Sequence, residues 1–304
     1  MPFNGFTCIV TGMHVSPDDC LTCAAQGGRE GADGLPCPLS APILRGIIEN
    51  AQPRGLQAYS ATELVGCPRQ VVFKDQVPYD VDPEQAYWLF RGTLGHQIVE
   101  AYTHGDAIVE QRLYATLNGM LLTGQPDVVY PDRRLVVDYK TTKRVPRNRK
   151  VYTCPDCGAV LRDNQWKARK RTQLTCPDCE MQYRAGDLTY ATHPPVPYDT
   201  HVSQLSIYRW LLHENGIAVE TGEIAYLSMA RTLRLPVELW PLDQTENYLA
   251  ECLQRLLDTG PDGLPCGVWD EPDAQWRCDY CAVKDTCLQH YREQGLHDAV
   301  AALD

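Results

Sequence analysis

The sequence lacks any apolar run long enough to cross a bilayer, and its first residues lack the charged-then-apolar pattern of a secretory signal. Internal repeats and long low-complexity linkers are missing as well. Positive charge is scarce, because 28 lysines and arginines face 39 aspartates and glutamates and leave a net charge of −11. We therefore expect a cytosolic protein without membrane contacts, in which any nucleic-acid surface is a local basic patch on an acidic body.

Cysteine, by contrast, is abundant and clustered. The chain of 304 residues, which is enough for one large domain or two small ones, contains 14 cysteines. In a reducing compartment, clusters of this kind bind metals more often than they form disulfides. The cysteine groups therefore predict several metal sites.

Two C-P-D-C motifs are the most specific of these groups. They run from Cys154 to Cys157 and from Cys176 to Cys179. Each pair supplies two thiolates, and four thiolates at this spacing suit the tetrahedral Zn²⁺ of a zinc ribbon. We expect residues 145–192 to form a ribbon inserted into the remaining chain.

The N-terminal residues 1–50 hold a less regular group of cysteines, among many glycines, prolines and aspartates. Cys20 and Cys23 form one C-x-x-C pair, and Cys8 and Cys37 lie to either side. Four thiols could close a small Zn²⁺ site here. The alternative is a loose arm with solvent-exposed thiols.

Basic residues gather around and inside the expected ribbon. In a net-acidic chain this clustering favours phosphate contacts with DNA, although a solvated charged surface is the alternative. Tyr152 and Trp166 could stack on the bases of a single strand, and Trp166 could equally belong to the ribbon core. The expected nucleic-acid-binding residues are Lys143, Arg144, Arg147, Arg149, Lys150, Lys167, Arg169, Lys170 and Arg171.

A predicted hairpin organises the candidate active site. Two β-branched runs flank the turn at residues 131–134, so the chain should fold back on itself there. The hairpin would bring Asp127 close to Asp138 and Lys140, which are two residues apart and so share one face of a strand. Two carboxylates beside a lysine suit a metal-dependent phosphodiesterase. Paired surface charges are the other explanation of such a pattern.

The remaining elements follow from periodicity and turn chemistry. Ser60 and Glu63 form a capping box that begins a short helix. Asn118 and Gly119 predict a hairpin turn between strands 107–116 and 119–130, which should form a three-stranded meander with strand 134–141. Further elements are predicted at 83–102 (helix, apolar residues near the helical period), 200–214 (helix), 222–230 and 233–240 (strands) and 243–258 (helix, with Cys252 in the core).

In this order the pieces resemble the RecB-like branch of the PD-(D/E)xK nuclease superfamily, and within it the CRISPR-associated iron–sulfur exonucleases and AddB-type nuclease domains. Four motifs carry the resemblance. They are the helical His96 in Gly-Thr-Leu-Gly-His, Asp127 in G-x-x-D, Asp138 and Lys140 in (D/E)-x-K, and Gln204 and Tyr208 in Q-x-x-x-Y.

The resemblance implies an α/β restriction-endonuclease-like core of order αβββαβ, a central mixed sheet flanked by helices, in residues 51–144 and 193–262. It implies a Mg²⁺- or Mn²⁺-dependent exonuclease acting on single-stranded DNA or DNA ends. His96, Asp127 and Asp138 would bind the ion, and Lys140 would position the attacking water. Gln204 and Tyr208 would hold the substrate phosphate or Lys140 itself.

The resemblance also implies an iron–sulfur module in residues 263–304. Cys278, Cys281 and Cys287 match the C-x-x-C-x₅-C group that ligates a [4Fe–4S] cluster with an upstream cysteine, here Cys67. Cys266 is the alternative fourth ligand. The reaction would serve CRISPR adaptation with an integrase complex, or recombination and repair with a helicase. The rival interpretation is a non-catalytic subunit that binds nucleic acid or supports assembly through its metals.

Overall fold

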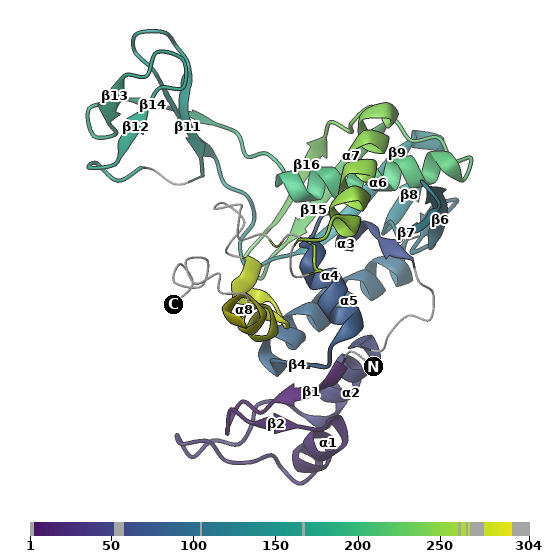
Figure 1. The fold of residues 1–304 in the computed structure, drawn as a ribbon. Coiled ribbons are helices and arrows are strands. Elements are labelled where there is room, and N and C mark those ends of the chain that lie inside the picture. The colour runs from purple at the N-terminus through teal and green to yellow at the C-terminus, as the bar shows by residue number, and fades with distance from the viewer. Residues whose placement is uncertain are drawn as a thin grey trace.

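The computed structural model describes residues 3–51, 58–103, 105–165, 168–260, 263–265, 267 and 277–293. It is a mixed α/β protein. A central body of sheet and helices carries a projecting arm of strands at one end and a small N-terminal segment at the other (Figure 1). In this described part of the chain, no helix combines the length and the apolar character that a membrane span requires.

A five-stranded mixed sheet forms the centre of the body. Its parallel pair, β9 and β15, is joined through the arm and helix α6 (Asp199–Glu214), because parallel neighbours need a long crossover. The other pairs are antiparallel, including the predicted hairpin of β8 and β9 around η1 (Pro131–Arg133). The strand order is β16 (Thr232–Val237), β15 (Thr221–Leu227), β9 (Leu135–Thr141), β8 (Val128–Tyr130) and β5 (Ile108–Val109).

Both faces of this sheet are covered, because alternate residues of each strand point to opposite sides. Val136 and Ile224 face the main core, to which α6 and α7 (Leu242–Leu257) contribute buried leucines and the buried Cys252. Val137 and Ala225 face a second core against α5 (Pro83–Tyr102). The sheet is therefore held between α6 and α7 on one side and α5 on the other.

A separate three-stranded sheet contradicts the expected meander. Asn118 and Gly119 make the predicted turn, with φ of 51° and 78°. The expected strand 119–130 is nevertheless broken, because Pro126 cannot donate to a ladder and interrupts it. The residues before the break pair in the order β3 (Tyr59–Ser60), β7 (Met120–Gly124) and β6 (Leu113–Leu117), while those after it form β8 in the central sheet.

Helix α5 has the predicted bounds, but part of its apolar stripe faces outward. Leu94, Ile98 and Tyr102, which recur near the helical period, are 42%, 62% and 76% exposed. The helix instead turns its small residues toward the sheet. A Cβ on Gly92 or Gly95 would lie 3.3 or 3.2 Å from the Thr141 side chain at the end of β9. The face of α5 that packs on β9 is therefore the one with Gly92 and Gly95, and not the one with the exposed apolar residues.

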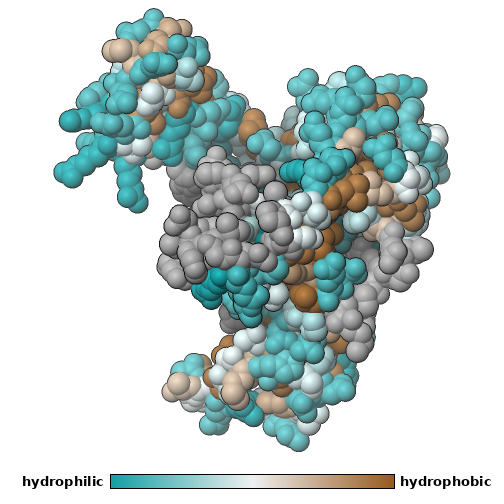
Figure 2. All heavy atoms as spheres, in the orientation of Figure 1, coloured by the Kyte–Doolittle hydropathy of each residue, from teal (hydrophilic) through white to brown (hydrophobic). Residues whose placement is uncertain are grey.

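The arm consists of the expected insertion. It contains a three-stranded sheet and a hairpin around its own small core, and most of its visible surface is hydrophilic (Figure 2). Tyr152 is completely buried in that core. The expectation that Tyr152 stacks on bases is therefore wrong. The strands are β10 (Arg149–Thr153), β11 (Val160–Asn164), β12 (Gln173–Thr175), β13 (Gln182–Arg184) and β14 (Tyr190–His193).

The remaining elements join the two ends of the chain to the body. The predicted capping box of Ser60 and Glu63 begins α3. The others are β1 (Phe3–Thr7), β2 (His14–Val15), α1 (Pro17–Ala25), α2 (Ala41–Ala51), α3 (Ala61–Leu64), α4 (Pro68–Gln76), β4 (Tyr79–Val81) and α8 (Lys284–Glu293).

Candidate active site and metal centres

The break between β7 and β8 positions Asp127. Its side chain is 4% exposed, and its Oδ2 accepts a hydrogen bond from the Tyr139 backbone N–H at 2.5 Å. The hairpin thus brings Asp127 beside the end of β9, as predicted. Its other oxygen, Oδ1, lies 3.0 Å from Nδ1 of His96 on α5.

His96 lies between two carboxylates. Its Nδ1 is 3.0 Å from Asp127 and 3.0 Å from Oε1 of Glu110, and ligand atoms of all three residues fall within 4.8 Å of one another. Hydrogen bonds to Asp127 and Glu110 raise the pKa of His96 to about 10. Two carboxylates this close repel each other, so a positive charge between them, either a protonated imidazole or a bound cation, is favourable.

Glu110 is the residue that the sequence analysis missed. It follows β5 with a φ of 49°, a left-handed conformation that is uncommon for a residue other than glycine. Its backbone N–H donates to the Asp127 carbonyl at 3.0 Å, and its Oε2 accepts from Gln125 Nε2 at 2.7 Å. Arg112 in turn donates to Gln125. No local motif identifies Glu110, because its partners come from a helix and a loop elsewhere in the chain.

Asp138 lies on a different side of the site. Its buried carboxylate is 2.9 Å from Lys140 Nζ, as expected for two residues on one strand face, and it is outside the group of His96, Glu110 and Asp127. Burial raises the pKa of Asp138, Lys140 opposes that shift, and Asp127 adds to it. The structure thus brings together two of the three expected ion ligands, with Glu110 as the third member of the group.

Lys140 is held from the opposite side by helix α6. Its Nζ donates to Gln204 Oε1 at 2.8 Å. Gln204 Nε2 donates to the Tyr208 hydroxyl at 2.7 Å and to Thr62 Oγ1 at 3.2 Å. Of the two expected roles of Gln204, contact with Lys140 is the one that these distances describe.

His201 was not singled out from the sequence. It lies on α6 three residues before Gln204, about one helical turn away. Its Nδ1 is 3.0 Å from the Tyr226 hydroxyl, which also accepts the Tyr198 backbone N–H at 3.1 Å. Burial and the charge of Lys140 lower the pKa of His201 to about 4. His201 is therefore a neutral imidazole beside Lys140.

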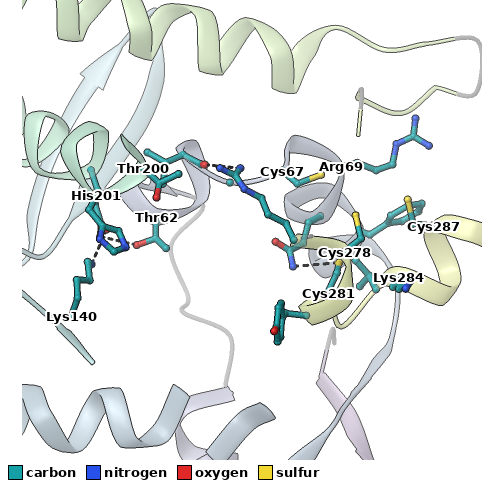
Figure 3. Close-up of a pocket in the computed structure, with 18 residues that line it drawn as sticks. Thr62, Cys67, Arg69, Lys140, Thr200, His201, Cys278, Cys281, Lys284 and Cys287 are labelled. Carbon is teal, nitrogen blue, oxygen red and sulfur yellow. Dashed lines mark hydrogen bonds between the residues drawn. The ribbon is translucent and has the colours of Figure 1, made fainter. Parts of the chain in front are cut away.

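A cavity of about 450 Å³ connects this site to the predicted iron–sulfur ligands (Figure 3). Lys140, His201 and Thr62 line one end. The other end is lined by Cys67, Cys278, Cys281 and Cys287. Lys140 and Gln204 therefore share one solvent space with the cysteine group.

Two segments far apart in the sequence meet at that cysteine group. Cys67 is the N-cap residue of α4 and packs against the small core that contains Cys278 and Cys287. Burial and the nearby thiols raise the pKa of Cys278 to about 12. Cys281 accepts a hydrogen bond from Gln70 at 3.4 Å. Cys266, the alternative ligand, lies outside the described residues.

The predicted ribbon thiols form the tightest cysteine group of the described chain. Cys154, Cys157, Cys176 and Cys179 lie within 4.8 Å of one another, with sulfur–sulfur distances of 3.4, 3.6 and 3.8 Å for three of the pairs. Zn–S bonds of about 2.3 Å in a tetrahedron place the sulfurs roughly 3.8 Å apart. These four residues can therefore hold a metal such as zinc.

The expected DNA-binding residues are placed unevenly. Arg149 pairs with Asp163, and Lys150 donates to Thr192 at 3.2 Å, so both are used within the arm. Lys143, Arg144 and Arg147 also have partners in the fold. Lys167 and Trp166 lie outside the described residues. The exposed members on the arm are Arg147, Arg169, Lys170 and Arg171.

Comparison with known proteins adds little to this geometry. No protein-family model and no curated protein matches the chain. Among solved structures, the protein named SSO0001 is 17% identical, with a TM-score of 0.47 over 79% of this chain and 91% of that one. A protein from Eubacterium rectale, described provisionally as an exonuclease, is 14% identical, with a TM-score of 0.26 over 74% of this chain and 71% of that one. At these values neither similarity assigns an activity.

Proposed function

We propose that this protein is a metal-dependent nuclease that hydrolyses phosphodiester bonds of DNA, as an exonuclease on single strands or DNA ends. One observation carries the proposal. His96, Glu110 and Asp127 converge within 4.8 Å, beside a lysine that is held by Asp138 on one side and Gln204 on the other. Metal ligands near an oriented ammonium group suit this chemistry, because the ion and the ammonium can both stabilise negative charge on a phosphate.

The donor set fits a hard divalent cation. Two carboxylates favour Mg²⁺ or Mn²⁺, and the imidazole of His96 favours Mn²⁺ of the two. His96, Glu110 and Asp127 would hold the ion, with Asp138 as the fourth ligand proposed from the resemblance. An ion bound there supplies electrostatic stabilisation to negative charge on a phosphate.

Lys140 would donate a hydrogen bond to the attacking water or to the phosphate. An ammonium group has three N–H donors, and Asp138 and Gln204 accept from two of them at 2.9 and 2.8 Å. The third is available to the cavity that Lys140 lines. Lys140 can thus orient an attacking water or donate to a phosphoryl oxygen, while Tyr208 and Thr62 keep Gln204 in place.

The cysteine groups complete the proposal. We assign Cys67, Cys278, Cys281 and Cys287 to a [4Fe–4S] cluster that ties the chain ends together, and the ribbon thiols to Zn²⁺. The ribbon thiols fall within 4.8 Å of one another, which suits a single ion.

The substrate and pathway are proposed from the resemblance and from charge. The exposed Arg169, Lys170 and Arg171 on the arm suit phosphate contacts. We place the reaction in the processing of DNA ends, either for CRISPR adaptation with an integrase complex or for recombination and repair with a helicase.

A nuclease assay on end-labelled single-stranded and duplex DNA tests the proposal. We expect cleavage with Mn²⁺ or Mg²⁺, none with EDTA, and none for Asp127→Ala, Asp138→Ala or Lys140→Ala. Arg234→Gln is the matched control, because it removes only an exposed ion pair with Glu223. If the wild type binds DNA without cutting it under every metal condition, the non-catalytic interpretation holds instead.

A further inference from the structure

We propose that Cys8, Cys20, Cys23 and Cys37 bind a second Zn²⁺ ion, which holds the N-terminal segment together and secures it against the helix that carries His96. This site lies outside the proposed catalytic centre and does not depend on it. The inference starts from a backbone turn that occurs three times among the residues that the structure describes.

In the ribbon, each C-x-x-C pair is part of the same tight turn. The Cys154 N–H donates to the carbonyl of Ala159, five residues on, at 2.7 Å, and the Gly158 N–H donates back to Cys154 at 2.9 Å. Gly158 has a positive φ of 79°. Cys176 begins an identical pattern, with distances of 2.8 and 3.1 Å. The turn wraps backbone around the first sulfur of each pair.

Cys8 begins a third turn of this kind. Its N–H donates to the carbonyl of Met13 at 2.8 Å, and the Gly12 N–H donates back to Cys8 at 2.8 Å. Gly12 has a φ of 68°, which matches Gly158. Thr11 holds the place of the second ribbon cysteine and hydrogen-bonds to the Cys8 sulfur. The backbone of a metal-binding turn is therefore present with one thiol instead of two.

The other three thiols lie on helix α1 and on the loop that follows it. Cys20 and Cys23 are three residues apart on α1 and share a face. Cys37 donates its N–H to Arg29 at 2.9 Å, and its side chain lies against Gly28, where a Cβ would be 3.3 Å away. Cys20 interacts electrostatically with Cys37, Cys23 and Cys8. Cys20 and Cys37 also pack against the same local core, so the four cysteines lie on neighbouring elements of one small segment.

The segment has a small core that a cross-link would strengthen. None of the residues of α1 is buried, and partly buried side chains such as Leu21, Cys20 and Cys37 pack against a few buried ones. The buried members of this core are Phe6, Leu39, Leu44, Ile47 and Ala86. Segments this small are usually ordered by a metal or by disulfides. All four cysteines are unpaired, and four sulfur ligands select zinc over Mg²⁺ or Mn²⁺. No three of the sulfurs lie within 4.8 Å of one another, so the ion would draw them inward.

The N-terminal segment contacts the part of the chain that carries the proposed catalytic residues. Strand β1 pairs in parallel with β4, immediately before α5. Helix α2 packs on α5, with Gly46 so close to Phe90 that a Cβ would lie 2.4 Å from the ring. A folded N-terminal segment therefore braces the first half of the helix that carries His96.

Metal counting on the full-length protein tests the inference. We expect two zinc ions per chain in the wild type, one in Cys20→Ser/Cys23→Ser and one in Cys154→Ser/Cys157→Ser. Cys252→Ser is the matched control and should retain two, because Cys252 is buried in the main core. Iron is counted in the same samples, and Cys281→Ser identifies any zinc that has replaced iron at the Cys67 group.

Two results would overturn the inference: a single zinc ion in the wild type, or two in Cys20→Ser/Cys23→Ser. Should that double variant fail to fold, the Cys154→Ser/Cys157→Ser protein still decides the question. It retains one zinc ion if the second site exists and none if it does not. Cobalt substitution of the same protein should give thiolate-to-metal absorption, which Cys37→Ser should weaken.

Discussion

Lys140 Nζ and Gln204 Oε1 lie 2.8 Å apart, although 64 residues separate them in the sequence. The contact joins the end of β9 to α6 across the point where the ribbon is inserted. Because Asp138 accepts from the same ammonium at 2.9 Å, the lysine is held by a strand neighbour and a helix together. The position of Lys140 Nζ therefore depends on β9 and α6 packing together, although the ribbon is inserted between them in the sequence.

Removing the ammonium should abolish cleavage without unfolding the protein. For Lys140→Ala we expect a loss of about 100-fold or more in the cleavage rate, which is typical when an oriented electrostatic contact is removed. Gln204→Ala should cost less, because Asp138 still holds Lys140. Single-turnover rates with circular dichroism of each variant provide the measurement, and a fully active Lys140→Ala would refute the assignment.

Glu110 should contribute to ion binding. Glu110→Gln removes one of the two charges that face His96, so we expect Mn²⁺ affinity to fall by roughly 10- to 100-fold. Calorimetric titration with Mn²⁺ measures this effect. Glu223→Gln, which breaks an exposed ion pair with Arg234, should bind Mn²⁺ like the wild type. Equal affinities for Glu110→Gln and the wild type would remove Glu110 from the ligand set.

His201 should make the protein less stable in acid. Its pKa of about 4 lies below the ordinary value of 6.5, so between these values the unfolded chain binds a proton that the native state does not. Stability should therefore fall as the pH drops from about 6.5 toward 4. In urea titrations at several pH values, His201→Gln should show a shallower decline than the wild type. Parallel curves would contradict this prediction.

Gly124 should not tolerate a side chain. A Cβ there would lie 2.5 Å from Leu211 Cδ1 and 3.0 Å from the Tyr208 ring, in the packed core between β7 and α6. We expect Gly124→Ala to lower the free energy of unfolding by about 1–3 kcal/mol, the usual cost of overpacking. Urea denaturation measures the change. An unchanged midpoint would mean that the end of the Leu211 side chain moves aside to accommodate the methyl group, and would contradict the prediction.

Contacts between near neighbours were predictable from the sequence. The Asn118–Gly119 turn, the Ser60 cap and the pairing of Asp138 with Lys140 depend on spacings of one to three residues, which backbone geometry alone determines. The same is true of Gln204 and Tyr208, one helical turn apart. Motif spacing likewise indicated the four ribbon thiols, because each turn is built from consecutive residues.

Only the tertiary structure decided which distant residues meet. Glu110 joined His96 and Asp127 because Pro126 ends one strand and β8 begins in another sheet. Leu94, Ile98 and Tyr102 face outward because Gly92 and Gly95 let α5 approach β9 more closely. Local chemistry specifies turns, caps and adjacent side chains. Which distant residues come into contact is decided by tertiary packing, because it depends on how all the helices and strands fit together.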